Sequence, residues 1–135
     1  MTEQRIKGHV GVGQKASGIA LVARDNFSAR YDLDRLKGVF SRPAHALHGQ
    51  SYVNAILVLH TAKGGVATSW MLREMKNRDM APAALLLNLG NPIMAQGAAF
   101  AGLAFMDRFE VDITEVIQSG DRVTVDPQAG LVVID

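Results

Sequence analysis

Short runs of apolar residues alternate with polar stretches along the first two thirds of the chain. The runs lie at residues 18–23 (GIALVA), 55–59 (AILVL) and 83–88 (AALLLN). A run that is apolar almost throughout, rather than at every second position, is typical of a strand covered on both faces of a sheet. The pattern therefore predicts three buried strands.

Residues 68–78 (TSWMLREMKNR) lie between the second and third runs and have a helical pattern. Trp70 and Met75 fall near helical spacing, and charged side chains lie opposite them. Thr68 or Ser69 is a suitable N-cap. A helix between two buried strands predicts a strand–helix–strand unit whose strands are parallel. Trp70 packs in the core or against a partner, and the sequence does not separate these alternatives.

The C-terminal part combines one more helix with short strands. Residues 91–105 open with Asn-Pro, a favourable helix start, and are rich in small residues that allow close packing on a sheet. Strand patterns follow at residues 108–113, 121–126 and 130–135. The turn sequence DPQAG separates the last two, so they are expected to form a hairpin.

Two stretches lack a clear period. Residues 1–17 are rich in glycine without the helix opening of a dinucleotide-binding motif, and we expect a loosely ordered lead-in with one short strand. Residues 24–50 are mostly polar, and such long excursions often carry function. The whole pattern predicts one α/β domain over residues 1–135, with a mixed sheet, two main helices and a β-rich C-terminal part.

Composition narrows the functional classes. The chain has 14 basic and 13 acidic residues, and no block of one sign offers a surface for nucleic acid or for an anionic membrane. It has no cysteine, which excludes disulfides, a cysteine nucleophile and iron–sulfur ligation by this chain. The N-terminus is polar and lacks the apolar core of a signal peptide. We expect a soluble, cytoplasmic protein.

The junction HTAKGGVATSW at residues 60–70 is a candidate site. Lys63, Gly64 and Gly65 lie between a predicted strand and a predicted helix. Such a turn can offer backbone N–H groups and a positive charge to a carboxylate or phosphate. The alternative is a bare turn with an exposed lysine.

The four histidines are weaker candidates. His45 and His48 lie three residues apart in a predicted loop, but no third ligand is nearby, so no metal site is predicted. His60 ends a strand beside the Lys63 turn, which makes it a candidate acid or base. A histidine that only faces solvent is the alternative.

Several segments together resemble the swivel domain, or small subunit, of aconitase X. They are HALHGQSYVNAILVL at residues 45–59, MAPAALLLNLGNPIMAQGAAFAG at 80–102 and SGDRVTVDPQAGLVVI at 119–134. The most specific elements are His48-Gly49-Gln50-Ser51 and the hairpin sequence that starts at Gly120-Asp121. The family includes dehydratases of phosphomevalonate and of cis-3-hydroxy-L-proline.

This resemblance implies a swivelling β/β/α domain like the mobile domain of aconitases. It further implies a large aconitase X-type subunit as partner, which holds an iron–sulfur cluster or metal, so that this chain by itself binds no cofactor. The substrate is expected to be a small acidic molecule in the cleft between the two subunits. The segment with His48, Gln50 and Ser51 is expected to lie near that substrate.

The chain departs from the family at one position. The family has a Gly-Arg-Gly-Ser-Ser-type turn whose first serine is its catalytic base, and here Lys63 and Gly64 are followed by Gly65 at the serine position. Thr68 and Ser69 are the nearby hydroxyls and are therefore the candidate catalytic residues. A hydroxyl needs an activating partner to act as a base, and helix capping is the simpler role.

Two hypotheses follow for the function. The first is a small swivel subunit of an aconitase X-like hydro-lyase that dehydrates a hydroxy acid or a hydroxyproline-type substrate, with Lys63, Gly64 and Gly65 binding the acid. The second is a swivel-fold binding or regulatory module that has lost the catalytic serine.

Overall fold

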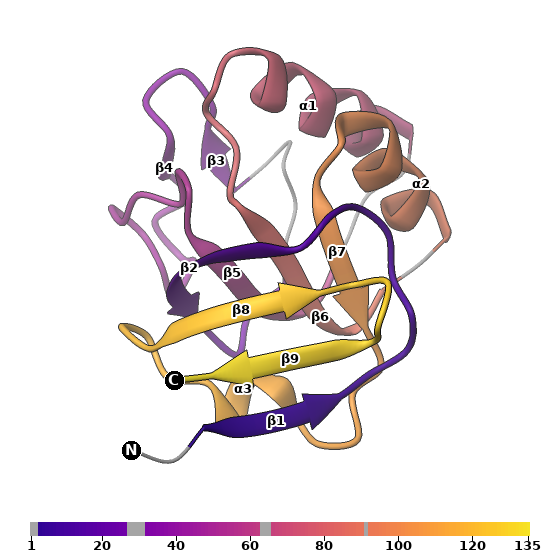
Figure 1. Ribbon diagram of the computed structural model, residues 1–135. Coiled ribbons are helices and arrows are strands. Elements are labelled where there is room, and N and C mark those ends of the chain that lie inside the picture. Colours follow the sequence, from indigo (N-terminus) through magenta and orange to yellow (C-terminus); the bar gives the residue numbers. More distant parts are fainter. Residues whose placement is uncertain (1–2, 27–31, 63–65, 91) are drawn as a thin grey trace.

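A computed structural model describes residues 3–26, 32–62, 66–90 and 92–135, and for residues 66–69 the backbone alone. The strands of the main sheet are β1 (Gln4–Lys7), β2 (Ala16–Val22), β5 (Ile56–Thr61), β6 (Ala84–Leu89), β7 (Ala104–Asp107), β8 (Arg122–Asp126) and β9 (Leu131–Ile134). The remaining elements are a small hairpin, β3 (Leu33–Asp34) and β4 (Val39–Phe40), and the helices α1 (Val66–Asn77), α2 (Pro92–Ala101) and α3 (Ile113–Val116). Within these ranges the seven-stranded sheet has the order β1-β9-β8-β2-β5-β6-β7 (Figure 1).

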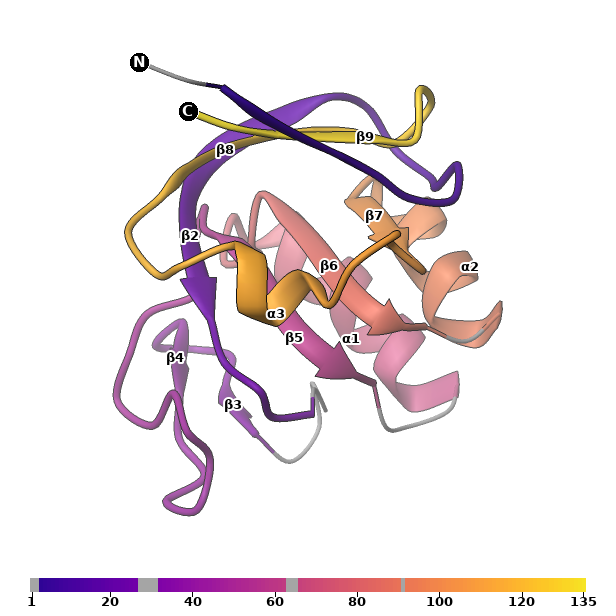
Figure 2. The same cartoon turned by 90° about the horizontal axis from the view of Figure 1, so that it is seen from below.

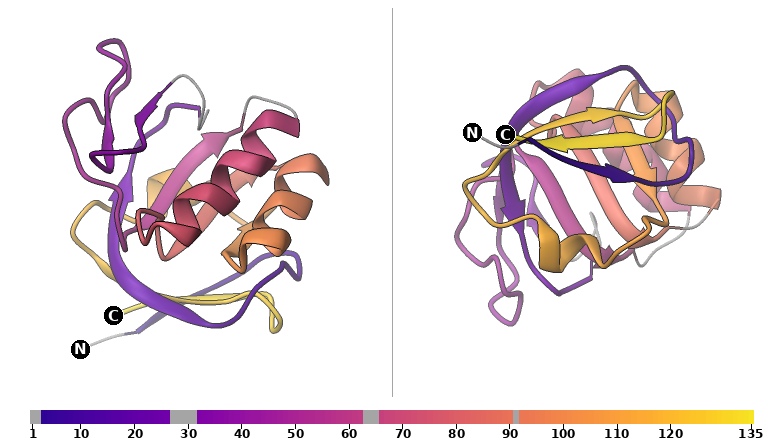
Figure 3. Two further views of the ribbon diagram at one scale, coloured as in Figure 1. Left: turned by 90° about the horizontal axis from the view of Figure 1, so that it is seen from above. Right: turned by 60° about the horizontal axis from the view of Figure 1, so that its bottom comes forward.

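One half of the sheet is parallel and carries the two longer helices. β2, β5, β6 and β7 are parallel neighbours. α1 connects β5 to β6 and α2 connects β6 to β7, and the two helices lie side by side over one face (Figure 3). The predicted strand–helix–strand unit is therefore confirmed, and so are two of the predicted buried strands, since β5 and β6 are apolar and buried over most of their length. The run at residues 18–23 does form a strand, β2, but only Ala20 and Leu21 in it are buried and Ile19 is 50% exposed, so burial throughout that run is wrong.

The other half of the sheet is antiparallel and curls over the face opposite α1 and α2. β2 joins the halves: Ala16–Ile19 pair with β8, and Ala20–Val22 pair with β5. β8 and β9 form the predicted hairpin, and β1 pairs with β9 (Figure 2). This bend divides the buried side chains into two cores, one beneath α1 and α2 and one between the curled strands and α3.

The N-terminal segment after β1 covers the free edge of β7. Gly8 bridges to Phe109 and Val12 bridges to Phe105, both antiparallel. A Cβ on Gly11 would collide with the carbonyl oxygen of Phe105, so the chain can run this close to β7 only with glycine there. Residues 1–17 are expected from the sequence to be a loosely ordered lead-in with one short strand. In the described part of this stretch, β1 is that strand, and the segment after it covers a sheet edge that could otherwise pair with another chain.

The predicted strand at residues 108–113 is wrong. The strand beside β6 is β7, and the chain leaves the sheet at Arg108, whose φ of 56° is left-handed. Asp112 then caps α3, because its side chain accepts a hydrogen bond from the backbone N–H of Thr114. The helix predicted to open at the Asn-Pro sequence is confirmed as α2, which ends at Ala101, where Gly102 turns the chain at a φ of 68°. The strand β7 that follows it is not among the predicted strands.

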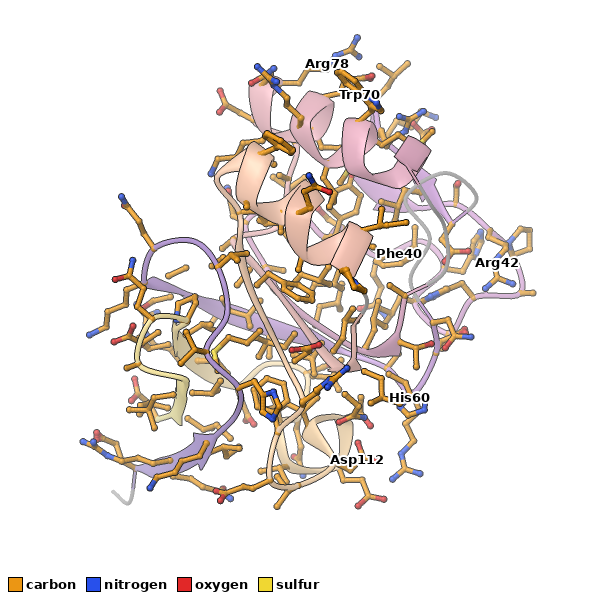
Figure 4. All side chains as sticks on the ribbon, turned by 90° about the vertical axis from the view of Figure 1, so that its right-hand side faces the viewer. Phe40, Arg42, His60, Trp70, Arg78 and Asp112 are labelled. Carbon is orange, nitrogen blue, oxygen red and sulfur yellow. The ribbon has the colours of Figure 1, made fainter. Side chains whose placement is uncertain are left out.

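The start of α1 also differs from the prediction. The helix begins at Val66, so Thr68 and Ser69 lie within its first turn rather than at the N-cap. Trp70 is 67% exposed on the outer face of the helix (Figure 4), which excludes its packing in this chain's core. Met75, in contrast, is buried beneath the helix.

Candidate functional site

The polar residues that follow the parallel strands gather at one edge of the sheet. Because β2, β5 and β6 run in the same direction, their carboxyl ends share that edge, where α/β sheets usually bind ligands. Val22, Val58 and Leu86 are register partners, and Val58 and Leu86 are buried while Val22 is partly buried. The residues two positions further on point to the same face of the sheet. They are Arg24, His60 and Asn88, which we call the edge row.

Asn88 is the centre of a hydrogen-bond network on this edge. Its Nδ2 donates to Oδ1 of Asp112 over 2.8 Å and contacts Nδ1 of His60 over 3.1 Å. Its Oδ1 accepts from the backbone N–H of Ile113 over 2.8 Å. The amide therefore ties the ends of β5 and β6 to the start of α3, and Figure 4 shows His60 and Asp112 on the same side of the molecule.

Asp112 is held as a carboxylate by several donors. Hydrogen bonds from Thr114 and Asn88 lower its pKa, against a smaller opposing effect of burial, and the charge of Arg24 lowers it further. Arg24 is ion-paired with both Asp112, at 3.9 Å, and Glu115. The edge row thus places an exposed guanidinium and an exposed imidazole above a stabilised carboxylate.

A second network lies at the end of β5, on the face that carries α1 and α2. Thr61 Oγ1 donates to Oδ1 of Asn26 over 2.5 Å. The backbone N–H of Leu47 donates to Nδ1 of His45, so the ring carries its hydrogen on Nε2 and donates it to the carbonyl of Asn26 over 2.9 Å. His45 is buried and stacks on Phe40, with ring centroids 4.5 Å apart. This buried histidine is a structural support for the end of β5.

Charged groups surround His45 and order the loop that carries it. Arg42 bonds Asp32 over 2.5 Å and lies 3.9 Å from Asp25. Burial raises the pKa of Asp25, but hydrogen bonds from the backbone of Asn26 and Ala46, together with the His45 and Arg42 side chains, bring the pKa below its ordinary value. The loop of residues 41–50 is therefore anchored to the carboxyl end of β2.

The sequence-predicted turn falls where the structure makes no statement. Lys63, Gly64 and Gly65 lie outside the described residues, and so do the side chains of Thr68 and Ser69. The described residues on either side are Thr61 and Ala62 at the end of β5 and Val66 at the start of α1. In sequence, the turn therefore follows directly on the carboxyl edge of the sheet.

His48, Gln50 and Ser51 are exposed in the loop between β4 and β5. Their main chain holds the loop together: the carbonyl of Gln50 accepts from Phe40, and Ser51 bridges to Val39. Within the described part of the chain, no hydrogen bond joins the side chain of His48 or Gln50 to another residue. These two side chains are therefore not part of the hydrogen-bond network of the edge row.

No metal centre is visible in the described residues. They contain no group of three or more His, Asp or Glu side chains arranged to hold an ion. His45 directs one ring nitrogen to a main-chain carbonyl and the other to a main-chain N–H, so it has no lone pair available for a ligand role. Among the same residues, no helix is both long and apolar enough to cross a membrane.

Sequence reasoning misses most of the residues that form these networks. The patterns along the chain do not single out Asn26, Thr61, Asn88 or Asp112. A usable signal is present for Asn88, because it is a polar residue at the end of an otherwise apolar strand. The Asp-Ile-Thr sequence at residue 112 is likewise an N-cap followed by an apolar residue, although its surroundings resemble a strand.

The chain is similar to known proteins over nearly its whole length. A model of the aconitase X swivel domain matches residues 5–134. The phosphomevalonate dehydratase small subunit of Methanocella arvoryzae is 35% identical over 128 residues, covering 95% of this chain and 97% of the relative. That of Methanothrix thermoacetophila is 36% identical over 129 residues, covering 96% and 93%. The crystal structure of Thermococcus kodakaraensis aconitase X in its holo form superposes with a TM-score of 0.90 at 29% identity, covering 98% of each chain.

Proposed function

The chain belongs to the aconitase X swivel-domain family, and we propose that it is the small subunit of a dehydratase. The observation that carries the proposal is end-to-end similarity to small subunits of phosphomevalonate dehydratase, at 35% identity over 95% of this chain. Phosphomevalonate is therefore the first substrate to test. It is a hydroxy acid with a phosphate, so its two anionic groups suit a site rich in N–H donors and positive charge.

The partner in this proposal is a large aconitase X-type subunit. That subunit holds the iron–sulfur cluster or metal, which supplies a Lewis acid for the departing hydroxyl. This chain supplies the surface that closes over the substrate and excludes water. The carboxyl edge of β2, β5 and β6 is that surface, since its polar networks order the end of each strand.

Lys63, Gly64 and Gly65 are proposed to bind an anionic group of the substrate. The turn follows the end of β5 in sequence and precedes α1, whose first N–H groups have no partner within the helix. His48, Gln50 and Ser51 are proposed as further substrate contacts from the loop between β4 and β5. Alanine at Lys63 tests the charge, and it should raise KM more than it lowers kcat.

The reaction also needs a base that removes a proton from the substrate. Dehydration breaks one C–H and one C–O bond and releases water. Gly65 stands where the family has its catalytic serine, and Thr68 and Ser69 are the hydroxyls proposed to replace it. Replacing both by alanine should lower kcat, whereas Gly65→Ser should raise it if the family geometry is retained.

The proposal is tested by producing this chain with the large subunit of the same organism. Size-exclusion chromatography measures whether the two chains form a stable complex. Mass spectrometry then measures loss of water from phosphomevalonate, from hydroxyproline and from a panel of hydroxy acids. A complex that dehydrates one of them supports the proposal, and two chains that neither associate nor dehydrate any of them contradict it.

The alternative is a swivel-fold binding or regulatory module without a catalytic group, and its motivation is Gly65. The two relatives described above are small subunits of phosphomevalonate dehydratase, and this similarity favours the first proposal over the alternative. The triple variant Lys63→Ala, Thr68→Ala, Ser69→Ala separates the two: unchanged turnover in an active complex means that these residues contribute no catalytic group.

A further inference from the structure

The side-chain amide of Asn88 can take only one orientation. Its oxygen accepts from the backbone N–H of Ile113, and its nitrogen donates to the carboxylate of Asp112, both over 2.8 Å. If the amide were reversed, its nitrogen would face the N–H of Ile113, which places two donors together. Its oxygen would face the carboxylate of Asp112, which places two acceptors together. Two independent contacts therefore fix which atom is the nitrogen.

This orientation determines the tautomer of His60. The Asn88 nitrogen has two hydrogens, of which one serves Asp112 and the other points to Nδ1 of His60 at 3.1 Å. Since an amide nitrogen can only donate, Nδ1 accepts, and the ring carries its hydrogen on Nε2. The Nε2–H group has no partner among the described residues.

His60 is thus a donor with a fixed direction on an exposed edge. The side chain is exposed and lies at the end of β5, three residues before Lys63 in sequence. An exposed histidine with no role would exchange between tautomers and rotamers, and holding it in one state costs conformational entropy. A donor that is oriented before the ligand arrives is the usual construction of a binding site.

We propose that His60 contacts the substrate, donating from Nε2 to an anionic oxygen of its carboxylate or phosphate, and that Asn88 is the positioning residue that sets this tautomer. The inference rests on the proposed function for the identity of the ligand. The tautomer itself follows from the contacts of Asn88 and is measured without any substrate.

The first experiment measures the tautomer in the full chain. Long-range proton–nitrogen NMR of the imidazole rings distinguishes hydrogen on Nε2 from hydrogen on Nδ1. His60 is expected to show hydrogen on Nε2, with the Nδ1 resonance of an acceptor. In Asn88→Asp, the introduced carboxylate can only accept, so the hydrogen is expected to move to Nδ1. Hydrogen on Nδ1 in the unmodified chain, or no change in the variant, overturns the inference.

The second experiment uses a matched pair of variants in the complex with the large subunit. The amide nitrogen of glutamine reaches the position of Nε2, and that of asparagine reaches the position of Nδ1. His60→Gln is therefore expected to retain most of kcat/KM for phosphomevalonate, and His60→Asn to lose about tenfold or more. His9→Asn, at an exposed histidine in the segment after β1, is the control and should change nothing.

Rescue by the double variant Asn88→Asp, His60→Gln separates positioning from a merely structural role. In Asn88→Asp, ring Nε2 becomes an acceptor, so kcat/KM is expected to fall. The amide of glutamine at position 60 donates whichever residue lies at position 88, so the double variant should regain most of the lost activity, and a double variant as inactive as Asn88→Asp overturns the positioning role of Asn88. The charged side chains around the row are Arg24, Asp112 and Glu115. The carboxylate introduced at position 88 is present in both the single and the double variant, so its charge does not account for a difference between them.

The outcomes distinguish the two proposals. An active unmodified complex with equal losses in His60→Asn and His60→Gln, or with none, overturns the role of His60 alone. An unmodified complex that dehydrates nothing counts against the proposed function and against a substrate contact by His60 together.

Discussion

Asn88 stands where a buried strand meets solvent, and three neighbours depend on its amide. The bond to the N–H of Ile113 satisfies one of the first donors of α3, and the bond to Asp112 holds the residue that caps the same helix. One side chain thus connects the sheet to the helix that covers its second core. We expect its removal to affect stability as well as the orientation of His60.

Asn88→Ala is predicted to lower the free energy of unfolding by about 1–3 kcal/mol, because it leaves the N–H of Ile113 without its partner. Urea unfolding followed by circular dichroism measures the change. Asn77→Ala, at an exposed position at the end of α1, is the control and should have a far smaller effect. Equal effects of the two substitutions would contradict the role assigned to Asn88.

Asp112 is predicted to make the protein sensitive to acid. Its pKa is below its ordinary value of 3.8 in the folded chain, so unfolding takes up a proton in acid. The stabilisation is present above that value and is lost as pH falls through the folded pKa. Asp112→Asn keeps a capping side chain but removes the titration. Its loss of stability between about pH 5 and pH 3 should therefore be smaller than that of the unmodified chain, and an equal loss would refute this assignment.

Tyr52 carries a buried hydroxyl that finds no hydrogen-bond partner in the described structure. Burial raises its pKa to about 12, and its ring meets Phe40 edge to face. Tyr52→Phe keeps the ring and removes the unsatisfied group, so the free energy of unfolding should rise by about 1 kcal/mol. Tyr52→Leu loses the ring contact and should lower it. A marked loss in the phenylalanine variant would show that the hydroxyl has a partner.

At the scale of elements, the glycine-rich segment after β1 is the clearest case of a motif that the structure explains. Gly8, Gly11 and Gly13 each lie against β7 or the residues around it, too close for a side chain. The spacing that resembles a nucleotide-binding sequence therefore reflects close packing of two backbone segments.

Gly11→Ala is predicted to lower the free energy of unfolding by more than about 2 kcal/mol, because the added Cβ would meet a backbone carbonyl that cannot move aside. Thermal unfolding measures the shift. Gln14→Ala, at an exposed position of the same segment, is the matched control. A Gly11→Ala protein as stable as the control would mean that this segment does not cover β7.

The elements differ in how far the sequence could predict them. The sequence predicts β5 and β6 from their apolar runs and α1 from its helical spacing. The burial of each of these elements is visible in the pattern of its own residues. The sequence pattern does not separate β7 from the preceding helix, since the small and apolar residues of positions 97–106 fit a helix and a buried strand equally well. α3 resembles a strand in sequence because four residues are too few to show a helical period.

The residues of the site likewise differ in how far the sequence could predict them. The Lys63 turn could be recognised because its residues are adjacent in the chain. The edge row could not, because Arg24, His60 and Asn88 follow or end three different strands and meet only through sheet register. The tautomer of His60 depends on contacts from β6 and from α3, which no pattern within β5 can reveal.

At the scale of the molecule, the bent sheet separates two ends. Both chain termini lie beside the antiparallel strands β1 and β9, while β2, β5 and β6 point away from them (Figure 2). The face proposed to meet the substrate is therefore away from the termini, and a tag at either end should leave it accessible.

The central claim is that this chain completes a dehydratase at the carboxyl edge of its parallel strands. The most direct measurement is a titration of the large subunit with this chain, following loss of water from phosphomevalonate. We predict little activity without the chain and a rise that saturates at equimolar amounts. Full activity of the large subunit alone, or none at any ratio with any hydroxy acid tested, would contradict the account.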